Sequence, residues 1–227
     1  MSHHQNITRI KAVYHALGDL GKKVLFVGGA TVSLYSDRPA SESRPTDDVD
    51  LLIELISYSG YADVEESLRK RGFVHDIDSG IICRFKVQGI VVDVMPTEGD
   101  VLGFSNRWYP EGFANSIEKD LGNNCIIKLF QPTYFIASKL EAFKGRGGGD
   151  GRTSSDFEDI VYILNNRTTI WNEMQTASSV VKEYLQIEFK KLLTKDHVYE
   201  WVSAHLDYSE QRRVDIIVNG MKQFIQR

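Results

Sequence analysis

The spacing of apolar residues changes near residue 130. Before that point, short apolar runs alternate with turns, which is typical of strands. The runs predicted to be strands are residues 23–27, 49–55, 81–87, 90–94 and 125–129. Residues 7–20 and 61–71 have helical spacing, and Gln88-Gly89 is a hairpin signal between two of the strands. After Pro132, nearly the whole chain is predicted to be helical.

This order of elements predicts the α+β class, with a mixed β-sheet flanked by helices and then a helical C-terminal part. We expect one domain over residues 1–130 and a second over residues 131–227. The hydrophobic fraction of 42% and the charged fraction of 26% are those of an ordinary globular protein. Two cysteines, Cys83 and Cys125, are too few for a disulfide scaffold and suit a reducing compartment.

Charge and hydropathy exclude some classes of function. The formal net charge of −4 argues against a protein coated in nucleic acid, although it leaves room for a local basic patch. No window approaches the ~18 apolar residues that a membrane span needs. The polar N-terminus has no signal-peptide core. We therefore expect a cytoplasmic protein with no membrane partner.

A glycine pair follows the first predicted strand. Gly28 and Gly29 separate the apolar run from a segment in which helical spacing resumes at Ala30. Glycines at such a turn let the backbone come close to a phosphate, and the amides of a following helix point at it. A tight turn that has only to pack would have the same residues. The pair is therefore a candidate nucleotide-binding turn only if other residues of the sequence also indicate a nucleotide site.

Two aspartates begin the second predicted strand. Asp48 and Asp50 project from one face of a strand, while Val49 and Leu51 point to the core. Two neighbouring carboxylates repel each other and need a compensating cation, and oxygen ligands are those that Mg²⁺ prefers. The alternative is that both acids are simply solvated where a loop leads into a strand.

Asp93 is the one acid in the apolar run of residues 90–94. Such a strand is expected to be largely buried, and an unpaired buried carboxylate is unfavourable. We therefore expect Asp93 to face a metal or a binding site. The alternative is a salt bridge with an arginine.

These three features together resemble the DNA polymerase beta-like nucleotidyltransferase superfamily, over roughly the first hundred residues. The resemblance implies that Gly28 and Gly29 grip phosphate. It implies that Asp48, Asp50 and Asp93 are the catalytic, metal-binding triad. Mg²⁺ or Mn²⁺ would be the metal, and a nucleoside triphosphate the substrate. The long interval between Gly29 and Asp48 departs from the compact members.

A longer pattern of residues narrows the resemblance from the superfamily to one family within it. The residues Arg44-Pro45-Thr46-Asp47-Asp48-Val49-Asp50 look like the Arg-x-(Ser/Thr)-x-Asp-x-Asp segment of the AbiEii-type toxin nucleotidyltransferases. Residues 138–143 and 152–160 resemble that family's helix-borne lysine and the Asp-x-x-Asp start of its next helix. This resemblance implies that Thr46 lies beside the nucleotide.

The same resemblance implies that Lys139 binds the triphosphate and that Asp156 supports the active site. Lys139 lies close to an apolar helix stripe, where a lysine either extends to solvent or meets an anion, and we favour the anion. Acids after Ser154 or Ser155 also suit a helix start, which is the alternative for Asp156. The inserted residues 145–151 leave the roles of Arg146 and Arg152 open.

The predicted reaction moves a nucleoside monophosphate from a triphosphate such as ATP to an acceptor hydroxyl and releases pyrophosphate. The toxin-family resemblance implies an RNA acceptor, with tRNA ends first, and an antitoxin protein as a partner. The helical part would supply a basic surface and complete the active-site cleft. Two alternatives stay open: modification of a small molecule such as an antibiotic, and a non-catalytic nucleotide-binding regulatory protein.

Overall fold

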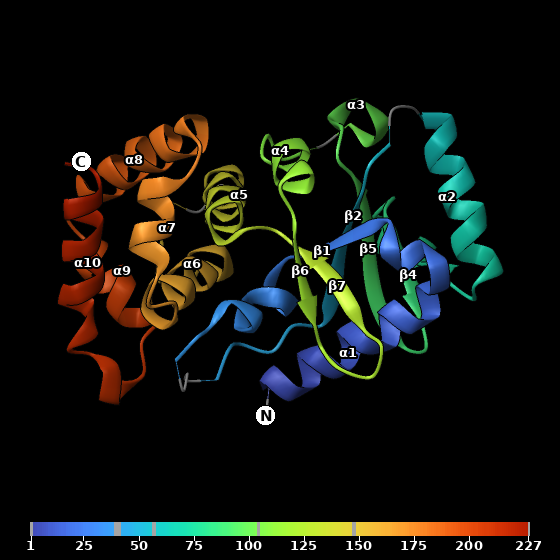
Figure 1. Cartoon of the computed structure of the whole chain (residues 1–227), viewed down its shortest axis with the longest axis horizontal. Helices are drawn as coiled ribbons and strands as arrows, with labels where there is room; N and C mark the ends of the chain where they lie inside the picture. Colours follow the sequence, from blue (N-terminus) through green and yellow to red (C-terminus); the bar gives the residue numbers. More distant parts are fainter. Residues whose placement is uncertain (1, 39–41, 56–57, 104, 147–148, 227) are drawn as a thin grey trace. The chain divides into compact units, whose positions relative to one another are not determined.

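The computed structural model describes residues 2–38, 42–55, 58–103, 105–146 and 149–226 (Figure 1). The chain forms two compact units. The first consists of residues 1–33 and 42–131, and the second of residues 34–41 and 132–227. A seven-stranded mixed sheet with flanking helices is followed by C-terminal helices, so the predicted fold class is confirmed.

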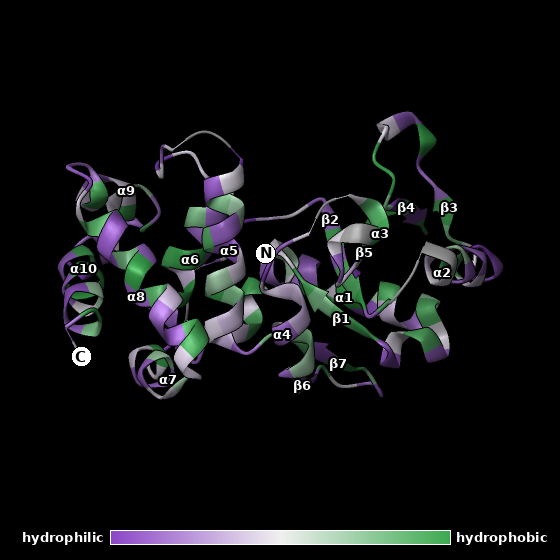
Figure 2. Ribbon diagram, turned by 90° about the horizontal axis from the view of Figure 1, so that it is seen from above, coloured by the Kyte–Doolittle hydropathy of each residue, from purple (hydrophilic) through white to green (hydrophobic). Residues whose placement is uncertain are grey.

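The sheet of the first unit has the strand order β3-β4-β5-β2-β1-β7-β6. The strands are β1 Val24–Val27, β2 Asp48–Ile53, β3 Val74–His75, β4 Arg84–Val87, β5 Ile90–Pro96, β6 Ile117–Asp120 and β7 Ile126–Leu129. β2 runs parallel to β5 and antiparallel to β1, and β1 runs parallel to β7. The central strands are hydrophobic, and β1 is hydrophobic along its whole length (Figure 2).

Helices and 3-10 turns connect these strands. They are α1 Ser2–Leu17, η1 Gly18–Lys22, η2 Gly29–Tyr35, α2 Tyr58–Lys70, η3 Ile77–Ser79, α3 Gly99–Leu102 and α4 Tyr109–Ala114. On β2, Val49 and Leu51 have no exposed surface, while Asp48 and Asp50 are half-buried. The alternation predicted for this strand is confirmed over its first four residues, because Val49 and Leu51 lie in the core and the two acids lie on the other face. Further along, Leu52 shares the face of the acids but is buried as well.

The hairpin predicted around Gln88-Gly89 is confirmed. Both residues have positive φ, 50° and 78°, and Val87 pairs with Ile90 across the turn. Two left-handed residues give a turn whose twist matches that of the flanking strands. β6 was not predicted, because its residues Ile-Glu-Lys-Asp are all exposed at the edge of the sheet and do not alternate.

The second unit is helical. It contains α5 Pro132–Gly145, α6 Ser155–Asn166, α7 Ile170–Thr176, α8 Ser179–Leu193, α9 Val198–Ala204, η4 Tyr208–Glu210 and α10 Arg213–Phe224. Ser154 caps α6, because its side chain accepts a hydrogen bond from the Phe157 amide at 3.2 Å. In the parts of the chain that the structure describes, none of the helices is both long enough and apolar enough to span a bilayer.

Residues 34–38 belong to this second unit although they precede β2. Arg38 donates a hydrogen bond to the Asn165 carbonyl at 2.7 Å, and Arg167 donates one to the Tyr35 carbonyl at 3.0 Å. Arg38 also pairs with Glu210 at 3.1 Å. These bonds fasten the segment to the end of α6, which a sequence-based division of the chain at residue 130 does not anticipate.

Candidate functional site

Three carboxylates lie together on β2 and β5. Asp48, Asp50 and Asp93 each offer one oxygen, and these oxygens lie within 4.8 Å of one another. The strand register explains this, because β2 and β5 are parallel and Asp50 lies directly opposite Asp93. Neighbouring residues in a ladder project from the same face of a sheet. The structure therefore brings together the three residues that the sequence analysis selected as the triad.

The cluster is partly open to solvent. Asp93 is 8% exposed, whereas Asp48 and Asp50 are half-buried. Three carboxylates at this separation repel one another, and the repulsion grows as burial removes water. Oxygen atoms of this kind, with open space on one side, are the donor set that Mg²⁺ or Mn²⁺ takes while keeping room for a phosphate.

Arg84 contacts two of the three carboxylates. Its Nε and Nη2 atoms donate hydrogen bonds to the two oxygens of Asp93 at 2.8 and 2.7 Å. Nη2 also lies 3.5 Å from Oδ2 of Asp48. The hydrogen bonds to Asp93, followed by the charges of Asp93 and Asp48, raise the pKa of Arg84 above its ordinary value, against the effect of burial. Arg84 is therefore a permanent cation in this site.

The alternative considered for Asp93, a salt bridge with an arginine, is present. Asp93 also lies in the carboxylate cluster, and its role as a metal ligand stays a prediction. Arg84 supplies one positive charge to the two carboxylates that it reaches, so it does not neutralise them. A bidentate guanidinium also fixes the plane of the Asp93 carboxylate. Arg84 was not among the predicted site residues.

The glycine pair lies beside this cluster. Gly28 has a φ of 73°, in the left-handed region, and a Cβ atom added there would overlap the Asp50 carboxylate. A Cβ atom on Gly29 would overlap the Arg44 guanidinium and lie 2.9 Å from the Thr46 methyl group. Both positions therefore require glycine on steric grounds. The predicted helix after them is the 3-10 helix η2, which is too short to act as a strong anion-binding helix terminus.

Thr46 leads into β2 next to the glycine turn. It is 4% exposed, and its hydroxyl lies 3.3 Å from both Oδ1 of Asn6 and the Asp48 carbonyl oxygen. Arg9 donates a hydrogen bond to the Thr46 carbonyl. Since Asn6 and Arg9 belong to α1, this helix holds the start of β2 in place. The structure puts Thr46 beside Gly29, and its contact with a nucleotide stays a prediction.

Cys83, the neighbour of Arg84, takes no part in this chemistry. Burial, and next the negative charge of Asp93, raise the pKa of its thiol to about 12. The thiol therefore stays protonated and is a poor nucleophile. Cys83 and Cys125 are both buried, which confirms that they act as small core residues.

Lys139 and Asp156 contact each other within the second unit. Lys139, on α5, is 8% exposed, and its Nζ atom lies 3.0 Å from Asp156 and 2.7 Å from Asp159. Arg146 reaches Asp156 as well, at 3.2 Å. Lys139 does meet anions, but the anions seen here are two carboxylates at the start of α6. The binding of a triphosphate by Lys139 and support of the active site by Asp156 stay predictions.

Replacing Lys139 with methionine is expected to destabilise the protein strongly. The change leaves Asp156 and Asp159, both at most 2% exposed, without their lysine. Breaking a buried ion pair from one side costs about 3–5 kcal/mol. Chemical denaturation measures the free energy of unfolding, and Lys190→Met on the exposed face of α8 is the matched control. Equal stability of the two variants would contradict the structural role of Lys139.

We compared the chain with known proteins. No protein-family model and no curated relative matches it. A solved structure that it resembles is that of an antigenic nucleotidyltransferase-like protein from Paracoccidioides brasiliensis, with 18% sequence identity and a TM-score of 0.51. The match covers 92% of this chain and 97% of that chain. At this identity the likeness establishes the fold alone, which is nucleotidyltransferase-like.

Proposed function

We propose that this protein is a metal-dependent nucleotidyltransferase, which transfers a nucleoside monophosphate from a nucleoside triphosphate to an acceptor hydroxyl and releases pyrophosphate. The observation that carries the proposal is the cluster of Asp48, Asp50 and Asp93 next to Gly28. The nucleotidyltransferase-like fold supports it independently.

Asp48, Asp50 and Asp93 are the residues that would hold Mg²⁺ or Mn²⁺. When bound, the metal supplies charge neutralisation at the reacting phosphate and its attacking and leaving oxygens. The chain's own residues then have separate tasks. Arg84 fixes the orientation of Asp93 through two hydrogen bonds. Each oxygen of Asp93 accepts one hydrogen bond from Arg84 and keeps a second lone pair, with which Asp93 would accept the proton of the acceptor hydroxyl.

The glycine turn lets the Asp50 carboxylate lie directly against the backbone. A Cβ atom at Gly28 would overlap this carboxylate, so the glycine helps to keep Asp50 in the position where it would hold the metal of a bound triphosphate. Lys139 and Asp156 would add contacts to the triphosphate and its surroundings, as the toxin-family resemblance implies. Transfer would then depend mainly on positioning and on charge neutralisation, as in other phosphoryl-transfer enzymes.

For the acceptor we propose RNA, with tRNA ends as the first candidate, because the residues 44–50, 138–143 and 152–160 resemble the AbiEii-type toxins. That resemblance also supports a toxin role with an antitoxin protein as partner. The second candidate is a small hydroxylated molecule, such as an antibiotic, which the same cluster of carboxylates could serve. A regulatory protein that only binds nucleotide is the remaining alternative.

The decisive experiment supplies each α-³²P-labelled nucleoside triphosphate in turn, together with Mg²⁺ and total tRNA. We expect label to appear on RNA with one preferred nucleotide and to be absent when EDTA replaces the metal. Label on an added small molecule instead would support the second candidate. Metal-dependent nucleotide binding without pyrophosphate release, for any acceptor, would overturn the transferase proposal.

A further inference from the structure

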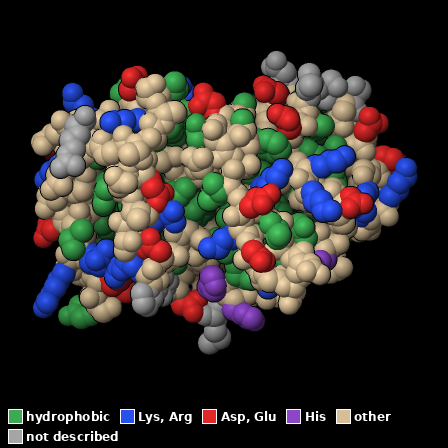
Figure 3. Space-filling model, viewed as in Figure 1, with side chains coloured by type: hydrophobic (Ala, Val, Ile, Leu, Met, Phe, Trp, Pro, Cys, Tyr) green, Lys and Arg blue, Asp and Glu red, His purple; other side chains and the backbone are tan. Residues whose placement is uncertain are grey.

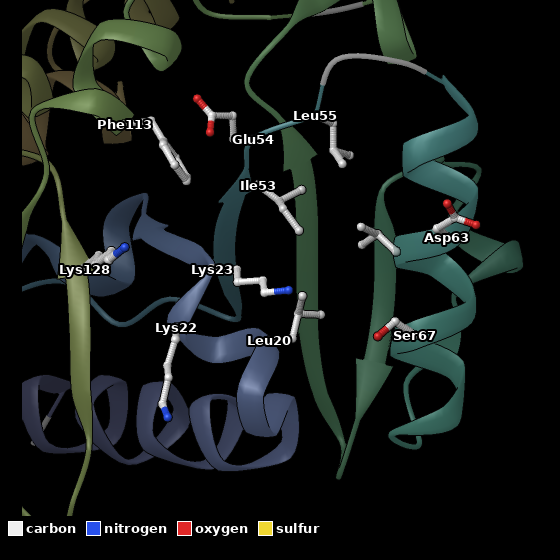
Figure 4. Close-up of a pocket in the computed structure, with 11 residues that line it drawn as sticks. Leu20, Lys22, Lys23, Ile53, Glu54, Leu55, Asp63, Ser67, Phe113 and Lys128 are labelled. Atoms are coloured by element: carbon white, nitrogen blue, oxygen red, sulfur yellow. The ribbon is translucent and has the colours of Figure 1, made fainter.

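A separate hollow lies at the far ends of β1 and β2 (Figure 4). Both strands contribute to the carboxylate cluster at one end, through Gly28 and Asp50. At the other end, Lys23 precedes β1 and Glu54 follows β2, and both residues line the hollow. Asp50 and Glu54 are four residues apart, or about 13 Å along an extended strand. The hollow is therefore distinct from the carboxylate cluster.

The hollow has the size and the apolar floor of a small-molecule site. Its volume is about 540 Å³, within the range usual for such sites. Apolar side chains from four segments of the chain line it: Leu20, Ile53 with Leu55, Val64 and Phe113. Figure 4 shows the ring of Phe113 projecting from α4 into the space above β1 and β2. A flat apolar group can lie against such a surface.

Charge is distributed unevenly around this floor. Lys23 and Lys128 extend into the hollow from the β1 and β7 side. Two acids, Glu54 and Asp63, line it as well, but both turn their carboxylates away from these lysines (Figure 4). Among the described residues, neither lysine has a carboxylate within ion-pair distance. Lys22 also lines the hollow, but its Nζ atom lies 3.9 Å from a carboxylate oxygen of Asp19.

Two ammonium groups at the wall of a concave surface, with no carboxylate at ion-pair distance, create a local positive potential. The net charge of the chain is −4, and Figure 3 shows basic and acidic side chains interspersed on the visible face of the first unit. An anion should therefore bind in this hollow in preference to the surrounding surface. Phosphate is the common biological anion that lysines bind as point charges.

We propose that this hollow is a second binding site, which takes a nucleotide. Lys23 and Lys128 bind its phosphate, and the apolar floor with Phe113 takes its base or sugar. The ligand is either a free mononucleotide or one nucleotide of a polynucleotide, and both present the same phosphate and base. Binding at this site needs no metal and no transfer reaction. The proposal is therefore independent of whether the carboxylate cluster is catalytic.

The test measures binding to the full chain in EDTA, which removes any contribution of metal at the carboxylate cluster. Isothermal titration with AMP, with inorganic phosphate and with a single-stranded oligoadenylate compares the protein with the double variant Lys23→Gln, Lys128→Gln. We expect AMP or oligoadenylate to bind at least about tenfold more weakly to this variant, the usual effect of losing charge-assisted hydrogen bonds. Melting curves should stay unchanged, because both lysines are at least partly exposed.

The matched control is Lys119→Gln, Lys190→Gln, which removes two exposed lysines and the same net charge but leaves Lys23 and Lys128 in place. It should bind like the unchanged protein. If the test variant binds AMP more weakly, the ligand of the hollow is a free nucleotide. If it binds only the oligoadenylate more weakly, the ligand is one nucleotide of a polynucleotide. Equal binding by the two double variants would overturn the site. Inorganic phosphate binding as tightly as AMP would overturn the role of the apolar floor.

Discussion

Replacing Asp48 with asparagine is expected to abolish nucleotidyl transfer while the protein still folds. The change keeps the shape of the side chain but removes one of the negative charges that would hold the metal. Loss of metal-assisted charge stabilisation is worth several kcal/mol, which corresponds to a rate at least about a thousandfold lower. Asp48 is half-buried and its contact with Arg84 is long, at 3.5 Å, so folding should be little affected.

Label transfer measures the activity of this variant, and the melting temperature with and without Mn²⁺ measures its folding and metal binding. The control is Asp47→Asn, an exposed acid next in sequence, whose loss changes the net charge equally. It should retain activity within about twofold. Asp93→Asn should lose activity like Asp48→Asn, but it should also unfold more easily, because Arg84 loses two charge-assisted hydrogen bonds. Retained transfer in Asp48→Asn would refute the triad.

The core of this site could be predicted because it depends on local periodicity. A strand alternates by its geometry, so Asp48 and Asp50 had to share a face once Val49 and Leu51 were assigned to the core. Asp93 stood out because an acid in an apolar strand needs a partner. The parallel register that sets Asp50 opposite Asp93 could not be derived, because it joins strands far apart in the sequence.

Arg84 was missed although a usable signal existed. The two-residue turn Gln88-Gly89 fixes the hairpin register, so that Val87 pairs with Ile90 and, three residues further out, Arg84 pairs with Asp93. Counting outward from the turn would have named this arginine. A salt bridge is one of the two interpretations of Asp93 in the sequence, and the hairpin register identifies Arg84 as its partner.

The sequence predicts that the second unit is helical, but it does not predict which side chains of its helices contact one another. Helical spacing predicts α5 and α6, and a cap at Ser154 or Ser155 is expected from the acids that follow, of which the structure shows Ser154. The pairing of Lys139 with Asp159 depends on how two helices pack, which spacing in one sequence does not contain. The attachment of residues 34–38 to α6 is equally non-local, since it joins positions about 130 residues apart.

Replacing Gly28 with alanine is expected to reduce transfer at least about a hundredfold, because a misplacement of about 1 Å in a catalytic group has that effect. Two causes combine at this position. The φ of 73° costs a residue with a Cβ atom about 1–2 kcal/mol, and the new methyl group overlaps the Asp50 carboxylate. Asp50 must then move away from Asp48 and Asp93.

Gly72→Ala separates these causes, because Gly72 has a similar φ of 85° but no atom within 4 Å of an added Cβ. Both variants should lose stability from backbone strain, measured by chemical denaturation, whereas only Gly28→Ala should lose label transfer and stabilisation by Mn²⁺. If the two variants kept the same activity, the glycine turn would be a packing feature alone. Loss of transfer in Gly28→Ala but not in Gly72→Ala would instead mean that glycine is required at position 28 because the Asp50 carboxylate lies against it. The turn would then be needed for the carboxylate cluster, and not only for folding.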